Sequence, residues 1–136
     1  MIKLFLCGLV VLFRSCAVNN EYIPRYSEHP LGNEITFIAE HRIQMTKIIV
    51  KKKNSYKVQE SIVELQNFFN AWSQTQTVLT KRQDQELLQT YCDLGRRILE
   101  DLSYHLERHG WKEALQSLDR IRSMEQNLLR DFANVQ

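Results

Sequence analysis

The sequence predicts an all-α protein, an up-down-up-down four-helix bundle, from three observations. Apolar residues recur every three or four positions in four segments, as they do on the buried face of an amphipathic helix. The connections between these segments are short, and short connections make successive helices antiparallel neighbours. No pair of alternating apolar and polar segments offers the partners of a β-sheet. With 136 residues, 43% of them hydrophobic and 25% charged, the chain suits one globular domain.

The first 17 residues differ from the rest and predict an export signal. Lys3 precedes an apolar run from Leu4 to Leu12, and Ser15-Cys16-Ala17 offers small residues suited to signal-peptidase cleavage after Ala17. About ten apolar residues are half of what a membrane-spanning helix needs, so a retained membrane anchor is disfavoured. We therefore expect an exported protein, periplasmic or secreted.

Lipidation at Cys16 is the alternative to simple cleavage, and it would attach the protein to a membrane. Against it, Phe13 and Arg14 stand where a bacterial lipoprotein signal has a small or aliphatic residue and a neutral one. The membrane is thus an expected partner only if Cys16 is lipidated or the signal is retained.

Cleavage would also change the charge and the cysteine content. The chain has 18 basic and 16 acidic residues, and removal of Lys3 and Arg14 leaves 16 of each. A net charge near zero gives no support for nucleic acid as a partner. Of three cysteines only Cys92 remains, so no internal disulfide forms, and its place on an apolar stripe predicts a buried small hydrophobe.

Residues 18–33 carry Pro24, Pro30 and Gly32 without a helical period, which indicates a tether or a segment draped over the bundle. The bundle itself is expected over residues 34–136. Its first helix is predicted over residues 34–53, with Asn33 as its cap and His41 on its apolar stripe. The stripe consists of Ile35, Ile38, Met45, Ile48 and Ile49. Two β-branched runs in this segment would also suit strands, but no partner segment exists for them.

The second helix, from Tyr56 to about Ser73, has the most regular stripe, with steps of four, three, four and three residues. Its members are Val58, Ile62, Leu65, Phe69 and Trp72. Residues 74–79 have no helical period and connect it to the next helix.

Residues 80–133 predict a hairpin of two long amphipathic helices. The first is expected at about 80–108, begun by a capping box of Thr80 and Gln83. Its stripe holds Leu88, Tyr91, Cys92, Gly95, Ile98, Leu99, Leu102, His105 and Leu106. The second stripe holds Trp111, Leu115, Leu118, Ile121, Met124, Leu128 and Phe132. Between the helices, Gly110 can take the left-handed conformation that ends a helix.

No catalytic or metal-binding spacing is found in the sequence, so we expect neither an enzyme nor a metal site. His41 and His105 lie on apolar stripes, where a hydrogen-bonded core histidine is the simplest interpretation. A second interpretation is geometric. The first and last helices run antiparallel, which sets His41 near the height of Met124, and a histidine facing a methionine across a bundle can hold haem iron.

The last hairpin, Gly110-Trp111-Lys112-Glu113-Ala114, resembles the Gly-x-x-Lys-Glu-Ala turn of the cytochrome b562 family of exported haem-binding bundles. With the export signal and four short-looped helices, the resemblance spans roughly residues 34–133. It implies the bundle fold and a haem-binding electron carrier. However, Leu129 and Ala39 stand at the family's ligand positions, and neither can bind iron. His41 with Met124 would be a swapped pair of ligands.

Leu79-Thr80-Lys81-Arg82-Gln83 is similar to the LTxxQ signature of periplasmic stress-response chaperones. That family carries two copies of the signature, and this chain has one. We expect a cofactor-free bundle that binds another protein or has a structural role, without catalysis. The alternatives are the haem carrier and the LTxxQ-type chaperone.

Overall fold

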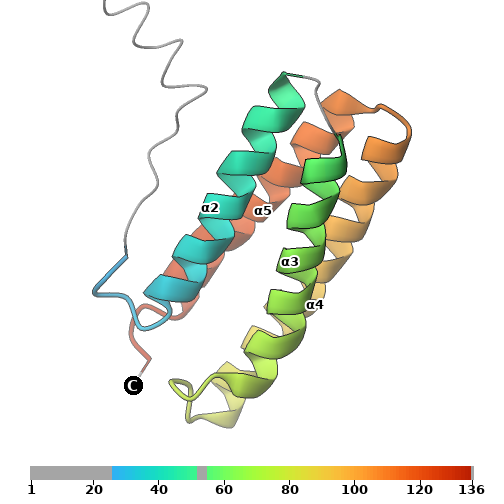
Figure 1. Ribbon diagram of the computed structural model, residues 1–136. Coiled ribbons are helices and arrows are strands. Elements are labelled where there is room, and N and C mark those ends of the chain that lie inside the picture. The colour runs from blue at the N-terminus through green and yellow to red at the C-terminus, as the bar shows by residue number, and fades with distance from the viewer. Residues whose placement is uncertain (1–25, 52–54, 136) are drawn as a thin grey trace, which may run out of the picture.

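A computed structural model describes residues 26–51 and 55–135, which form four helices (Figure 1). The helices are α2 (Gly32–Val50), α3 (Ser55–Thr75), α4 (Arg82–Glu107) and α5 (Trp111–Asp131). None of the described helices is both long and apolar enough to cross a membrane. The predicted export signal (residues 1–17) and residues 18–25 of the predicted tether lie outside the described residues, as do Lys52 and Lys53 at the end of the first predicted helix.

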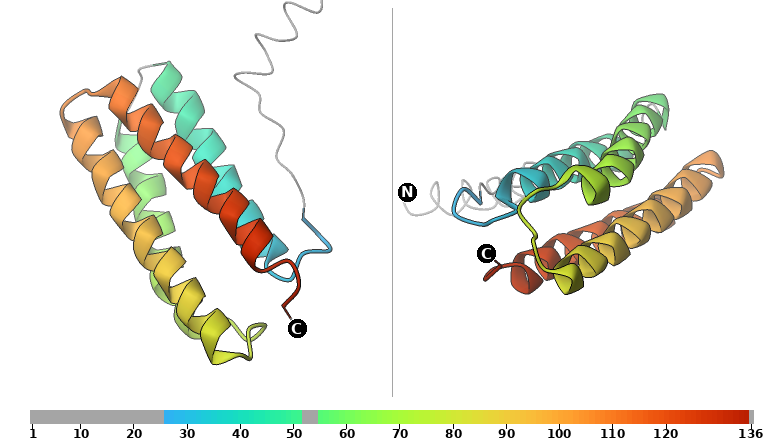
Figure 2. Two further views of the ribbon diagram at one scale, coloured as in Figure 1. Left: turned by 180° about the vertical axis from the view of Figure 1, so that it is seen from behind. Right: turned by 90° about the horizontal axis from the view of Figure 1, so that it is seen from below.

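The four helices run alternately up and down, and each packs against two neighbours. Contacts join α2 to α3, α3 to α4 and α4 to α5, and a fourth set joins α2 to α5 and closes the ring. Figure 2 shows the two hairpins, α2 with α3 and α4 with α5, as two packed layers. The predicted all-α, up-down-up-down four-helix bundle is therefore confirmed.

The core consists of one apolar stripe from each helix, as the periodicity predicts. All five residues of the regular stripe on α3, from Val58 to Trp72, are buried. The stripes on α4 and α5 are also buried, except that Tyr91, His105, Trp111 and Leu115 are only half-buried. Burial of these four stripes against one another is the main source of stability of the bundle.

Gly95 lies in the middle of α4, where glycine normally weakens a helix. A Cβ atom added to Gly95 would lie 2.7 Å from two ring carbons of Phe69 on α3. The missing side chain therefore makes room for a fully buried aromatic ring from the neighbouring helix. This close approach explains a glycine inside a predicted helix.

The start of α2 differs from the prediction, because Asn33 lies inside the helix and Leu31 occupies the cap position. His29 instead accepts the hydrogen bonds of two backbone N–H groups at the start of the helix. Its ring Nδ1 accepts a hydrogen bond from the Leu31 N–H (3.0 Å), and its carbonyl accepts one from the Gly32 N–H (3.0 Å). Leu31 is fully buried and Tyr26 packs against the core, so both ends of the segment before α2 contact the bundle.

The start of α4 also differs, since the helix begins at Arg82 with Lys81 as its cap residue. The prediction that Thr80 is the N-cap residue of a capping box with Gln83 is therefore wrong, because the N-cap residue is Lys81. Two glutamines hold the preceding loop: the Gln76 side chain accepts a hydrogen bond from the Leu79 N–H (2.8 Å), and Gln85 donates one to the Leu79 carbonyl (2.9 Å). The buried Leu79 anchors this loop to the core.

The turn between α4 and α5 is where predicted, but its left-handed residue is His109 (φ 55°) and not Gly110 (φ −81°). The Gly110 N–H donates to the His105 carbonyl (2.8 Å), and the His109 N–H donates to the Leu106 carbonyl (3.1 Å). These two bonds define a Schellman motif with His109 at the position that usually holds glycine. Gly110 instead caps the start of α5.

The turn gives a prediction about stability. Because an L-residue pays for the left-handed conformation and glycine does not, His109→Gly should raise the free energy of unfolding by about 1 kcal/mol. Urea denaturation measures the change. His109→Ala is the matched control, since it removes the ring and keeps the backbone strain. If the glycine variant is no more stable than the alanine variant, His109 is not strained.

Candidate functional site

His41, the first predicted haem candidate, lies between α2 and α3 and not in the space facing α5. Its Nε2 contacts Glu64 Oε2 on α3 (2.8 Å), and its Nδ1 contacts the Phe37 carbonyl (3.1 Å). Both partners are acceptors, so both contacts are hydrogen bonds only when the ring carries two protons. Neither ring nitrogen is left to bind a metal in this arrangement. His105 is half-buried near the end of α4, against the Tyr104 ring.

Met124, the second candidate, is buried on α5. The sequence predicts that His41 on α2 lies at the same height in the bundle as Met124 on α5. This alignment of the two helices agrees with the structure, because the next residue on each helix, Arg42 and Glu125, form a contact. Ala39 and Leu129 stand at the positions that hold the haem ligands in the cytochrome b562 family. Ala39 is fully buried, and Leu129 packs at the edge of the core. The structure thus brings together the neighbours of the predicted pair.

Arg42 and Glu125 form a buried, two-point ion pair between α2 and α5. Arg42 Nε donates to Glu125 Oε2 (2.6 Å), and Arg42 Nη2 donates to Glu125 Oε1 (3.2 Å). Each side chain is only 5% exposed. Such bidentate pairs are strong and directional, and a charge that loses its partner in this environment is costly.

The sequence analysis missed this pair, although a signal for it exists. Arg42 lies four residues after Ile38 and three before Met45, in the middle of the α2 stripe. Glu125 lies four residues after Ile121 and three before Leu128, in the middle of the α5 stripe. Two opposite charges on the apolar faces of helices that run antiparallel would have predicted their pairing.

Burial in the bundle changes the pKa of two further titratable side chains, Cys92 and Tyr91. Burial raises the pKa of the Cys92 thiol to about 11, which fits the predicted buried hydrophobe and not a reactive nucleophile. Burial and a hydrogen bond to Asp131 raise the pKa of Tyr91 to about 12. Within residues 26–51 and 55–135, no group of three or more His, Cys, Asp or Glu side chains could hold a metal ion.

A cavity of about 280 Å³ lies at the end of the bundle where α2 begins and α3 ends. Its walls come from three elements: the start of α2, the last two turns of α3 and the loop that follows. The lining residues are Leu31, Glu34, Phe68, Ala71, Trp72, Thr75, Gln76, Thr77 and Val78. We call this space the end cavity.

The walls of the end cavity are held by side-chain hydrogen bonds to the backbone. On one side His29 Nε2 donates to the Leu129 carbonyl of α5 (3.0 Å), while its Nδ1 supports Leu31. On the other side Gln76 and Gln85 fix the loop through Leu79. The end cavity is therefore preformed, which favours binding because little order has to be created by a ligand.

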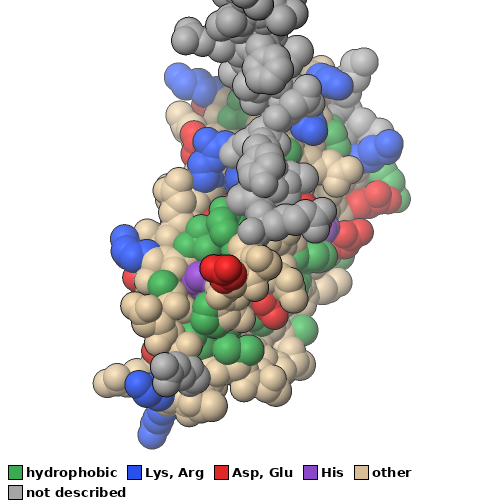
Figure 3. Space-filling model, turned by 90° about the vertical axis from the view of Figure 1, so that its left-hand side faces the viewer, with side chains coloured by type: hydrophobic (Ala, Val, Ile, Leu, Met, Phe, Trp, Pro, Cys, Tyr) green, Lys and Arg blue, Asp and Glu red, His purple; other side chains and the backbone are tan. Residues whose placement is uncertain are grey.

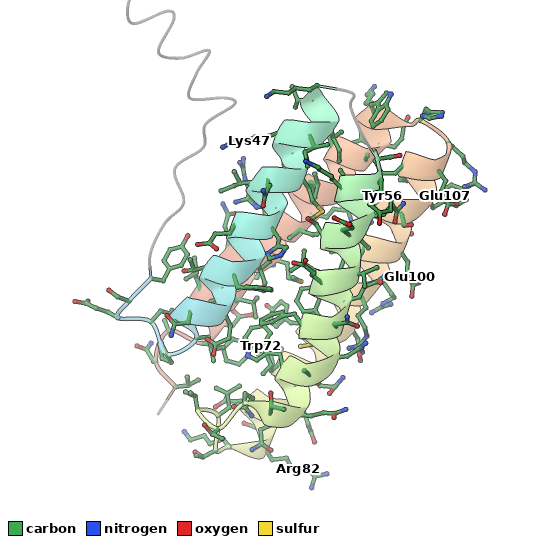
Figure 4. All side chains as sticks on the ribbon, in the orientation of Figure 1. Lys47, Tyr56, Trp72, Arg82, Glu100 and Glu107 are labelled. Carbon is green, nitrogen blue, oxygen red and sulfur yellow. The ribbon has the colours of Figure 1, made fainter. Side chains whose placement is uncertain are left out.

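Trp72 is one of the residues that line the end cavity. The residue is 4% exposed, and its indole Nε1 is buried without a hydrogen-bond partner among the described residues. Figure 4 shows Trp72 on the lower part of α3, on the side that faces the start of α2. The centroid of its ring lies 5.2 Å from that of Phe68, and the Phe68 centroid lies 4.8 Å from that of Phe37 on α2. These three rings form an aromatic seam between α2 and α3.

The surface outside the end cavity is mixed in character. Figure 3 shows the α2 side of the molecule, where basic side chains are most frequent toward the end at which α2 terminates, and apolar side chains are visible among polar ones nearer its start. Several large apolar side chains are exposed on other helices, among them Tyr56 (69%) and Val63 (52%) on α3. Scattered exposed apolar residues are normal on soluble proteins and define no site by themselves.

The fold and the end cavity together define an antiparallel four-helix bundle with a preformed, aromatic-lined recess at one end. Comparison with protein-family models, curated proteins and solved structures finds no match to this chain. The resemblances to the cytochrome b562 family and to the LTxxQ chaperones remain predictions from short motifs.

The ion pair gives a prediction about stability. Arg42→Met and Glu125→Leu should each lower the free energy of unfolding by about 3–5 kcal/mol, since each leaves one charge buried without its partner. The double variant should recover most of that loss, because two apolar side chains can pack in place of the pair. Urea denaturation of the four proteins measures the coupling. Additive effects of the two substitutions would show that the charges do not depend on each other.

Proposed function

We propose that the protein is exported and acts by binding another protein through the end cavity, without catalysis and without a cofactor. The observation that carries this proposal is the preformed, aromatic-lined recess at the end of the bundle.

The interior of the bundle supports a cofactor-free function. At the level of His41 and Met124, α2 and α5 contact each other directly through the Arg42–Glu125 pair. The His41 ring is engaged by Glu64 and by its own helix. A haem held by His41 and Met124 would have to break both arrangements.

Export carries its own prediction. Because Ser15-Cys16-Ala17 suits signal-peptidase cleavage, the intact mass of the exported protein should correspond to a chain that begins at Val18. A lipidated chain that begins at Cys16 would also be an exported product. A full-length protein that accumulates inside the cell would contradict export.

The binding function is tested by blocking the end cavity without touching the core. Ala71 lines the cavity and is exposed, so Ala71→Tyr should fill the recess and leave the fold intact. Asn70→Tyr is the matched control, because Asn70 is also exposed and does not line the cavity. Each tagged protein is cross-linked in the producing cells, purified from the exported fraction, and its bound proteins are identified by mass spectrometry.

A partner present in stoichiometric amount with the wild type and with Asn70→Tyr, and lost with Ala71→Tyr, is the expected result. The same purified material should show no Soret absorbance band, before or after addition of one equivalent of haem. Identical bound proteins for all three variants would contradict the end cavity as the binding site. A haem band that disappears in His41→Ala would favour the haem carrier instead.

A further inference from the structure

We propose that the end of the bundle opposite the end cavity docks onto an anionic phospholipid membrane, and that this contact needs no lipid attached to the chain. We call it the turn end, and it consists of residues 47–51, 55–57 and 104–113. Figure 1 shows these segments together at the top of the molecule, where α2 ends and α4 turns into α5. Because the end cavity lies at the other end, the inference does not rest on the binding function proposed for that cavity.

Basic residues are concentrated at the turn end. Of the five lysines among the described residues, four lie there, and Lys81 lies elsewhere. With one arginine, five basic side chains stand against two acidic ones, which gives this end a net charge of +3. The basic residues are Lys47, Lys51, Lys57, Arg108 and Lys112, and the acidic ones are Glu107 and Glu113. Lys52 and Lys53 lie outside the described residues and are not part of this count.

The end that carries the end cavity has the opposite charge. Residues 26–34, 76–86 and 129–135 contain three basic and five acidic side chains, a net charge of −2. The bundle is therefore an electrical dipole along its long axis, although the chain that follows the predicted signal has 16 basic and 16 acidic residues. An anionic surface orients such a molecule, because it attracts the turn end and repels the end that carries the cavity.

The apolar side chains of the turn end favour a membrane as the anionic partner. Six large apolar side chains are exposed among the described residues, and three of them, Val50, Tyr56 and Tyr104, lie at this end. Half-buried Trp111 begins α5 there. Tyrosine and tryptophan next to lysine and arginine are the residues that anchor proteins at membrane–water interfaces. The Arg108 guanidinium lies 3.6 Å from the centroid of the Tyr104 ring, so this pair presents charge and aromatic surface together.

The test measures how the exported chain that begins at Val18, which carries neither signal nor lipid, sediments with vesicles. One set of vesicles is phosphatidylcholine alone, and the other contains roughly 30% phosphatidylglycerol, which is anionic. The protein should bind the anionic vesicles at low salt and should not bind the neutral ones. Binding should weaken as salt is added, because salt screens the exposed charges.

Removal of three lysines tests the surface directly. Lys51, Lys57 and Lys112 are exposed, so their replacement by glutamine should leave the fold intact (Figure 4 labels Tyr56, the neighbour of Lys57). Each lysine near an anionic membrane contributes about fivefold to the affinity, so the triple variant should bind about a hundredfold more weakly than the wild type.

The matched control removes three exposed basic side chains outside the turn end, through Lys81→Gln, Arg82→Gln and Arg97→Gln together. This variant has the same net charge as the triple lysine variant. It should bind anionic vesicles as the wild type does, because its substitutions lie away from the docking surface. Ala71→Tyr, which blocks the end cavity, should also bind vesicles as the wild type does, so the two sites are judged separately.

The orientation of the bundle is measured with its two tryptophans. Trp111 lies at the turn end, whereas Trp72 lines the end cavity at the other end. Anionic vesicles with brominated acyl chains should quench part of the tryptophan fluorescence, and Trp111→Phe should remove the quenched part. Quenching that survives in Trp111→Phe would contradict docking through the turn end.

Three results of the sedimentation test would overturn the inference: no binding to anionic vesicles at low salt, equal binding to neutral and anionic vesicles, or equal losses in the two triple variants. Nucleic acid is the other anionic polymer that a cluster of cations attracts. Binding of a fluorescent single-stranded oligonucleotide by a protein that ignores the vesicles would therefore also overturn it, and would assign the turn end to nucleic acid.

Discussion

The ion pair between Arg42 and Glu125 is the interaction on which the arrangement of the bundle depends. Short loops dictate the three contacts between consecutive helices, but no loop dictates how α2 meets α5. The two charges stand 83 positions apart in the chain and meet through two hydrogen bonds, from Nε and Nη2 of the Arg42 guanidinium to the two carboxylate oxygens of Glu125. Because a shift of one helical turn would leave two buried charges unpaired, the pair fixes the register in which the ring of helices closes.

That register also builds the end cavity. When α2 and α5 are aligned at Arg42 and Glu125, the turn before α2 meets the end of α5, and His29 reaches the Leu129 carbonyl. The start of α2 then lies opposite the last turns of α3, with Leu31 and Glu34 facing Phe68 and Trp72 across the recess. A single polar contact in the core is thus connected to the shape of a surface site about three helical turns away.

The predictions that were wrong concern the residues that cap helices or form turns. In each of them the local sequence suited more than one residue, and a neighbour of the predicted residue took its position. Asn33, Thr80 and Gly110 are good capping or turn residues, yet Leu31, Lys81 and His109 occupy those positions. At two of these places an adjacent residue makes a contact beyond the local pattern: His29 hydrogen-bonds to the Leu129 carbonyl before α2, and buried Leu79 anchors the loop before α4. Arg42 and Glu125, each one residue from a predicted haem candidate, form the pair that joins α2 to α5.

The sequence by itself determined the fold class, the number of helices in the described chain and most of the core, because a helix buries whichever stripe of its own surface is apolar. The stripe from Val58 to Trp72 needed no partner to be recognised. The tertiary structure alone decided that Trp72 and Glu34 would line the same recess. This fact depends on which ends of α2 and α3 meet, and that is set by the packing of residues far apart in the chain.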